Sequence, residues 1–174
     1  MIAALAVVVA LLAPACYPPP VAASVSVPYV QPACAYCAGH RGLEYELATG
    51  SPVRAVASGT VTFAGVVAGT RYLVVLQPDG LRATYGMLGA TSLTRGDVVE
   101  QGQVVGHSTV RLYFGLRNAA DEPVDPTPLL GRLAGRPRLV PTDGSAARPA
   151  GAPRLVCAGV VSARFVGARR ESGR

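Results

Sequence analysis

Two short runs of β-branched and aromatic residues limit the folds open to this chain. The runs lie at residues 59–63 and 71–76, and the turn residues Pro78-Asp79-Gly80 follow the second run. Such residues favour strands, and a turn of this composition joins neighbouring strands of an antiparallel sheet. No segment with a helical period rivals these runs. The sequence therefore predicts an all-β domain.

Several blocks of residues follow one another along the chain in a distinctive order and spacing. These blocks are residues 40–44, 50–65, 80–85, 96–106, 111–114 and 124–126. Over about half of its length the chain resembles the lysostaphin-like, or LytM-type, zinc metallopeptidases, a family of peptidoglycan endopeptidases. The resemblance implies a small antiparallel barrel-like sandwich of the duplicated hybrid motif type.

The zinc chemistry of that family needs three protein ligands and one open position for water. In the family a His and an Asp four residues later supply two ligands, and these positions correspond to His40 and Glu44. The second His of a His-x-His strand supplies the third ligand, where this chain has Tyr113 after Arg111. Arg111 stays protonated, and its charge about 6 Å from a divalent cation costs roughly 5 kcal/mol at an effective dielectric near 20.

A further catalytic His of the family corresponds to Met87, whose thioether cannot act as an acid or a base. The loop between Gly106 and Arg111 is also shorter than in the family. We therefore expect a degenerate site without catalytic residues, bound metal or any other cofactor. In place of the metal we expect a Glu44–Arg111 ion pair. The full predicted cluster or groove lining is His40, Glu44, Tyr85, Arg111 and Tyr113, with Tyr72 as a further candidate for the groove.

The resemblance implies a function for a degenerate member, because such members bind cell-wall material or activate separate wall hydrolases. We expect a non-catalytic module of the bacterial envelope that binds peptidoglycan or regulates a wall hydrolase. The alternative is an active zinc endopeptidase that cleaves peptidoglycan cross-links with His40, Glu44 and His107 as an altered ligand set. A carrier of biotin or lipoate is excluded, because the chain has no Lys to bear the group.

The first 15 residues are apolar and end in Ala13-Pro14-Ala15, the small-x-small pattern that precedes signal cleavage. The apolar run is too short to span a bilayer, so it predicts an exported protein that is secreted or held in the envelope. Cys16 follows directly, and a lipid anchor on Cys16 is an alternative fate. Residues 16–33 have the proline-rich composition of an extended linker.

Four cysteines in an exported chain indicate disulfides. Three complete pairings are possible, and the sequence does not choose among them. Cys34 with Cys37 is the simplest local bridge, whereas a bridge from either residue to Cys157 would tie the tail to the domain. Cys34, Cys37 and His40 also recur at steps of three, which can suit zinc, although a fourth ligand is not evident.

Charge divides the chain into a balanced domain, residues 34–131, and a flexible basic tail, residues 132–174. Residues 40–131 hold seven Arg and eight acidic residues, whereas residues 132–174 hold nine Arg and two acidic residues. A tail of that charge can contact anionic envelope polymers, and the scarcity of aromatic residues beside the arginines argues against nucleic acid. Within the tail, residues 154–166 have strand-like content and can add an edge strand to the domain.

Overall fold

The computed structural model describes residues 16–34, 37–135, 141–143, 145, 146, 149, 151 and 153–157. The predicted signal segment and most of the predicted basic tail lie outside these residues. Within the described part of the chain, no helix has the length and apolar character needed to cross a bilayer.

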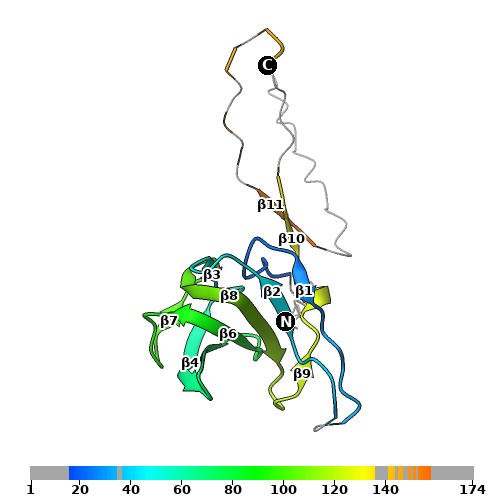
Figure 1. Cartoon of the computed structure of the whole chain (residues 1–174), viewed down its shortest axis with the longest axis vertical. Coiled ribbons are helices and arrows are strands. Elements are labelled where there is room, and N and C mark those ends of the chain that lie inside the picture. The colour runs from blue at the N-terminus through cyan, green and yellow to red at the C-terminus, as the bar shows by residue number, and fades with distance from the viewer. Residues whose placement is uncertain are drawn as a thin grey trace, which may run out of the picture.

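Strands make up almost all of the regular structure (Figure 1). In chain order the elements are β1 (Val25–Val27), β2 (Leu43–Glu46), β3 (Pro52–Arg54), β4 (Gly59–Val67), β5 (Thr70–Leu76), β6 (Arg82–Ala90), β7 (Val98–Val99), β8 (Val104–Arg117), β9 (Pro123–Val124), the 3₁₀ helix η1 (Thr127–Leu129), β10 (Arg132–Ala134) and β11 (Arg154–Val156). The all-β prediction is confirmed.

Nine strands form one antiparallel sheet in the order β1-β2-β8-β6-β5-β4-β7, and β3 and β9 also pair with β8. The long strand β8 is the hub, because its first half pairs with β3 and its second half pairs with β2. Strand β6 lies on the other side of β8 along both halves. Strand β8 thus joins β2 and β3, which come early in the chain, to β6 within one sheet.

The core lies on one face of this sheet and follows the two-residue alternation of the strands. Along β8, Leu112, Phe114 and Leu116 are fully buried, while the residues between them point to the opposite face. The other buried hydrophobic side chains of the core are Tyr17, Val21, Leu43, Tyr45, Val53, Ala55, Val56, Val61, Leu73, Val75, Ala83, Tyr85, Leu88, Val99 and Val105. The outward face is therefore free to carry polar and aromatic residues.

Residues 16–33 do not form the extended linker that their composition predicts. Tyr17 is only 7% exposed and pairs with Leu130, donating its N–H to the Leu129 carbonyl and accepting one from Gly131. Val21 is also buried, and β1 adds an edge strand to the domain beside β2. The linker prediction is wrong because these apolar side chains gain more by burial against the sheet than by remaining in water.

The predicted strand at residues 154–166 is present in part but has a different partner. Strand β11 covers Arg154–Val156, and it pairs with β10 in a separate two-stranded sheet that projects from the domain (Figure 1). It adds no edge to the main sheet, so that prediction is wrong in its pairing. Cys157 follows β11 directly and forms a disulfide with Cys16.

Candidate functional site

The outward face of the sheet carries a row of residues that crosses four strands. The ladder places Tyr72 of β5 opposite Gly86 of β6, Gly86 opposite Tyr113 of β8, and Tyr113 opposite Glu44 of β2. Two residues along β8 from Tyr113, Arg111 lies on the same face. Predicted site residues that are far apart in sequence are thus brought together by register alone.

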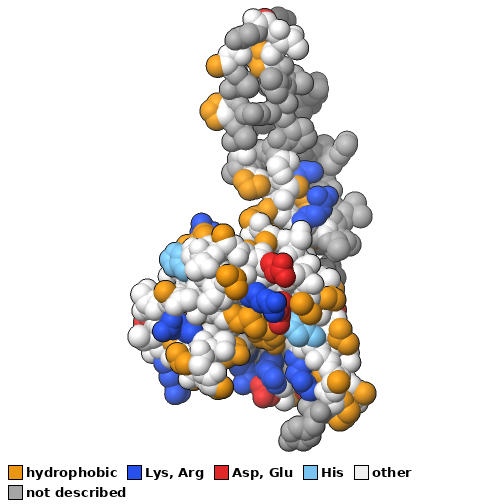
Figure 2. Space-filling model, viewed as in Figure 1, with side chains coloured by type: hydrophobic (Ala, Val, Ile, Leu, Met, Phe, Trp, Pro, Cys, Tyr) orange, Lys and Arg blue, Asp and Glu red, His pale blue; other side chains and the backbone are white. Residues whose placement is uncertain are grey.

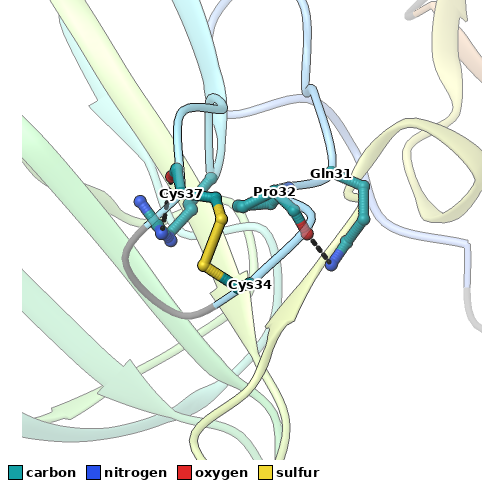
Figure 3. The surroundings of a disulfide bond; sticks show 5 residues. Gln31, Pro32, Cys34 and Cys37 are labelled. Atoms are coloured by element: carbon teal, nitrogen blue, oxygen red, sulfur yellow. Dashed lines mark hydrogen bonds between the residues drawn. A yellow bond between two sulfur atoms is a disulfide. The ribbon is translucent and has the colours of Figure 1, made fainter.

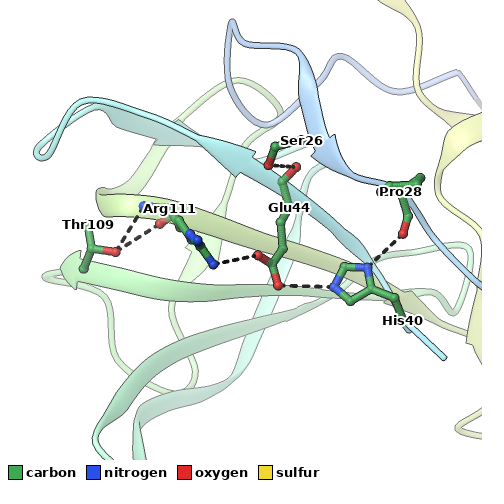
Figure 4. Close-up of polar contacts among 6 residues, drawn as sticks. All are labelled: Ser26, Pro28, His40, Glu44, Thr109 and Arg111. Atoms are coloured by element: carbon green, nitrogen blue, oxygen red, sulfur yellow. Dashed lines mark hydrogen bonds and ion pairs between the residues drawn. The ribbon is translucent and has the colours of Figure 1, made fainter. Parts of the chain in front are cut away.

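His40, Glu44 and Arg111 form a chain of polar contacts on this face (Figure 4). His40 Nε2 lies 3.2 Å from Glu44 Oε1, and Arg111 Nη1 lies 3.7 Å from Glu44 Oε2. The Glu44 side chain is 15% exposed, whereas the Arg111 side chain is 55% exposed. Glu44 is therefore a half-buried carboxylate held between a histidine and a solvated guanidinium.

The ring of His40 is fixed from its other side. Its Nδ1 lies 3.0 Å from the Pro28 carbonyl oxygen, which can only accept, so Nδ1 donates there. Both ring nitrogens therefore lie within hydrogen-bond distance of oxygen atoms, which fixes the orientation of the ring. A metal-binding histidine is held in the same way, with one N–H on a carbonyl and the other nitrogen aimed at the site.

Tyr113 lies at the third ligand position of the resembled family, and its hydroxyl is already engaged by a backbone carbonyl. The hydroxyl donates to the Arg41 carbonyl at 2.9 Å, and the ring makes an edge-on contact with His40 at a centroid distance of 6.0 Å. Burial raises the pKa of Tyr113, which disfavours the phenolate that metal binding would need. A Cβ at Gly42 would lie 2.7 Å from this ring, so the ring rests directly on the backbone there.

Met87 sits in a bulge where β6 and β8 lose their register. Gly86 pairs with Tyr113 and Leu88 pairs with Ser108, so one residue of β6 faces four residues of β8. The backbone of Met87 has φ of +60°, and its carbonyl accepts a hydrogen bond from the Thr109 hydroxyl at 3.0 Å. The shortened segment before Arg111 is therefore part of a strand with a wide bulge and not a loop.

Two other sequence predictions are placed away from this cluster. Tyr85 is 0% exposed, and its hydroxyl oxygen accepts the Val56 N–H at 2.9 Å inside the core. The prediction that Tyr85 lines the groove is therefore wrong, because alternation along β6 turns it inward. His107 pairs with Pro52 and with Ala90 at the other end of the bulge, so it does not join His40 and Glu44.

The donor set does not fit a catalytic zinc ion. Of the family's ligand positions, only His40 and Glu44 offer suitable atoms, and the cation Arg111 already neutralises Glu44. Across the described residues, no group of three or more His, Cys, Asp and Glu side chains is arranged to hold a metal. The alternative ligand set with His107 is not assembled here, and no chemical step can be derived through zinc.

Sequence reasoning missed a second cluster further along β8. Arg117 and Arg82 both lie near Asp121, at 3.5 and 3.3 Å, and Arg117 with Arg41 lines a pocket of about 560 Å³. Figure 2 shows arginine and acidic side chains beside a hydrophobic patch in the middle of the domain. The alternation of Arg111, Tyr113 and Arg117 in one strand could have revealed this polar face.

Comparison with known proteins identifies relatives of this domain. The sequence model of Peptidase family M23 matches residues 38–126. An uncharacterized protein of Mycobacterium tuberculosis is 45% identical over 47 residues, which are 27% of this chain and 19% of that protein.

Two solved structures share the fold. Csd3 of Helicobacter pylori aligns with a TM-score of 0.58 and 25% identity over 67% of this chain and 35% of its own. Lysostaphin of Staphylococcus simulans aligns with a TM-score of 0.54 and 25% identity over 61% of this chain and 49% of its own. The chain spans less than half the length of each of these three relatives. Because the family match covers half of the chain and includes eight of the nine strands of the main sheet and the polar cluster described above, this chain belongs to peptidase family M23.

Proposed function

We propose that this chain is a catalytically degenerate member of its family that binds peptidoglycan or regulates a wall hydrolase in the bacterial envelope. The observation that carries the proposal is the Arg111–Glu44–His40 chain of contacts. It places a permanent cation against the carboxylate that a metal would need. With Met87 and Tyr113 at two further family positions, neither the metal nor the proton carriers of a peptidase are provided.

The outward face retains what a binding site needs. Tyr72 and Tyr113 lie on neighbouring parts of the sheet, and the absence of a side chain at the buried Gly86 between them lets the Tyr72 ring pack against the strand. Arg41 and Arg117 line the adjoining pocket and can pair with carboxylates of a wall peptide. These features support recognition of an extended peptide without its cleavage.

An exported location is part of the same proposal. All four cysteines are paired, as Cys16–Cys157 and Cys34–Cys37, and such bonds persist in oxidising compartments. A lipid anchor on Cys16 would need a free thiol there, but the Cys16 sulfur is bonded to Cys157. We therefore favour a secreted or envelope protein without acylation of Cys16.

Zinc content and binding to isolated cell walls test the proposal together. Purified protein should contain far less than one zinc per chain by elemental analysis and should not clear a wall suspension, with or without chelator. It should co-sediment with purified peptidoglycan, and Tyr113→Ala should weaken co-sedimentation while the distant His107→Ala does not. Stoichiometric zinc with chelator-sensitive clearing would instead establish the active endopeptidase.

A regulatory role predicts a different outcome in the same setting. If the domain acts on a wall hydrolase, it should change the clearing rate of that hydrolase when added to it, even where its own sedimentation with the wall is weak. Failure in both the sedimentation and the hydrolase assays would contradict the proposed function.

A further inference from the structure

The two disulfides differ in exposure and in the length of chain that each closes. Cys34 and Cys37 are three residues apart and joined by a disulfide (Figure 3), and Cys34 is exposed. Cys16 and Cys157 are 141 residues apart and both are partly buried, and a Cβ at Gly131 would lie 2.9 Å from the Cys16 sulfur. Thiols reduce exposed disulfides more readily than enclosed ones, so the two bonds should not respond alike.

The Cys34–Cys37 bond closes the tip of a loop whose base holds His40. Val30 and His40 exchange both backbone hydrogen bonds, each 2.9 Å long. The Pro28 carbonyl, just before this pair, accepts the bond from His40 Nδ1. Residues 28–40 thus hold the His40 ring in place. The Cys34–Cys37 disulfide lies at one end of this loop, and the contact of His40 with Glu44 lies at the other.

The same loop forms a wall of the pocket beside the site. Gln31, Pro32, Ala33 and Cys34 line it together with Arg117 and residues 121–123. Arg41 also lines this pocket, and its Nη2 donates to the Cys37 carbonyl at 3.4 Å. Opening the loop tip would therefore change the pocket as well as the setting of His40.

We propose that the Cys34–Cys37 disulfide is a reducible site whose redox state controls how firmly His40 is held beside Glu44. The reaction partner is a dithiol reductant, either a small molecule or a protein with two neighbouring thiols. The inference rests on the fold of this loop and not on the proposed function.

The exchange balances as an ordinary thiol–disulfide reaction. A thiolate of the reductant attacks the exposed Cys34 sulfur, the bond to Cys37 breaks, and Cys37 leaves as a thiolate that takes up a proton. The second thiol of the reductant then attacks the mixed disulfide and releases Cys34 as a thiol. The protein gains two electrons and two protons, and the reductant becomes a disulfide.

Reduction should loosen the loop without unfolding the domain. A bond across so few residues removes little chain entropy from the unfolded state, whereas one across most of the chain removes much more. The local cost falls on the exposed loop, whose base is held by the Val30–His40 pair. Local opening of this kind raises amide exchange in one segment and leaves core strands protected.

Hydrogen exchange measured by NMR during mild reduction tests the proposal on the full chain. With a limiting amount of dithiothreitol, alkylation and tandem mass spectrometry should find thiols at Cys34 and Cys37 before Cys16 and Cys157. In that state, exchange of the His40 amide should rise roughly tenfold, while exchange of the Leu112 amide in β8 should not change.

Two double variants serve as controls. Cys34→Ser with Cys37→Ser should show the raised His40 exchange without reductant and no further response to it. Cys16→Ser with Cys157→Ser, compared at a temperature where circular dichroism shows that it is folded, should keep the response of the wild type. Simultaneous reduction of both bonds, or unchanged His40 exchange once reduction at Cys34 and Cys37 is verified, would overturn the proposal.

Discussion

At the scale of single residues, Arg111 decides the character of the site. Its guanidinium is more than half exposed, yet it lies within 3.7 Å of the half-buried Glu44 carboxylate. An arginine in solvent loses little by pairing in this way, whereas a zinc ion at the same carboxylate would be repelled by it. The same carboxylate also contacts His40, so Glu44 interacts with two basic side chains at once.

Restoring the family's residues should therefore restore metal binding. A variant with Glu44→Asp, Arg111→His and Tyr113→His removes the cation at position 111. The new side chains at positions 44 and 113 then complete a set of three ligands together with His40. We expect its zinc content to rise towards one per chain, measured by elemental analysis after dialysis. Glu44→Asp alone retains Arg111 and should stay free of zinc. A triple variant as poor in zinc as the wild type would mean that the bulged backbone, and not the side chains, prevents binding.

The Glu44–Arg111 pair should contribute only modestly to stability. Because Arg111 is solvated, a double-mutant cycle with Glu44→Gln and Arg111→Gln should give a coupling energy of about 0.5 kcal/mol in urea unfolding. Glu100→Gln, which removes an exposed carboxylate just after β7, is the control and should show no coupling to Arg111. A coupling above about 2 kcal/mol would indicate a desolvated pair and a different geometry.

Tyr45 should make the protein sensitive to alkali. Burial raises the pKa of Tyr45 to about 12, above its ordinary value near 10. Its contribution to stability is fully present below pH 10 and is lost as the pH rises through 12, because only the unfolded state ionises easily. At pH 11 the loss should be about 1 kcal/mol. Urea unfolding at pH 8 and 11 should show a smaller loss in Tyr45→Phe than in the wild type.

At the scale of elements, strand β8 links the core to the site through alternation. Leu112, Phe114 and Leu116 fill the core, and Arg111 and Tyr113 reach the outward face. The Tyr113 ring also depends on Gly42, the residue before β2, because a Cβ there would meet both the ring and the Phe114 carbonyl oxygen. Core packing and the aromatic surface are therefore set by the same pair of strands.

Gly42→Ala tests this dependence. The added Cβ would lie 2.6 Å from the Phe114 carbonyl oxygen, so backbone or ring must move, and we expect a loss of about 1–3 kcal/mol in urea unfolding. Gly135→Ala has open space around it and should change stability by less than about 0.5 kcal/mol. Equal effects of the two substitutions would show that Tyr113 does not rest on Gly42.

The sequence predicted the strands, the family and the residues that meet at Glu44, because strand propensity and motif order are local signals. Alternation along residues 82–86 also carried the information that Tyr85 points inward, and that signal was overlooked. The pairing of Cys16 with Cys157 and the packing of Tyr17 depend on contacts between distant segments. Local patterns do not encode such contacts, so the linker was predicted wrongly.

At the scale of the whole molecule, the Cys16–Cys157 bond encloses the entire main sheet. Cross-linking across 141 residues restricts the unfolded chain strongly, and chain-entropy arguments give about 5 kcal/mol for a loop of this length. Cys16→Ser with Cys157→Ser should therefore lower the free energy of unfolding by several kcal/mol. Urea unfolding of the double variant, compared with Cys34→Ser and Cys37→Ser, checks this, since the short bridge should matter far less.

That enclosing bond also determines how the domain bears mechanical load. Tension on the tail beyond Cys157 reaches Cys16 through the sulfur atoms as well as β11 through the backbone, so the load is shared between two distant points of the chain. The outward face of the main sheet, which lies between these two points in the sequence, should keep its shape under such a load.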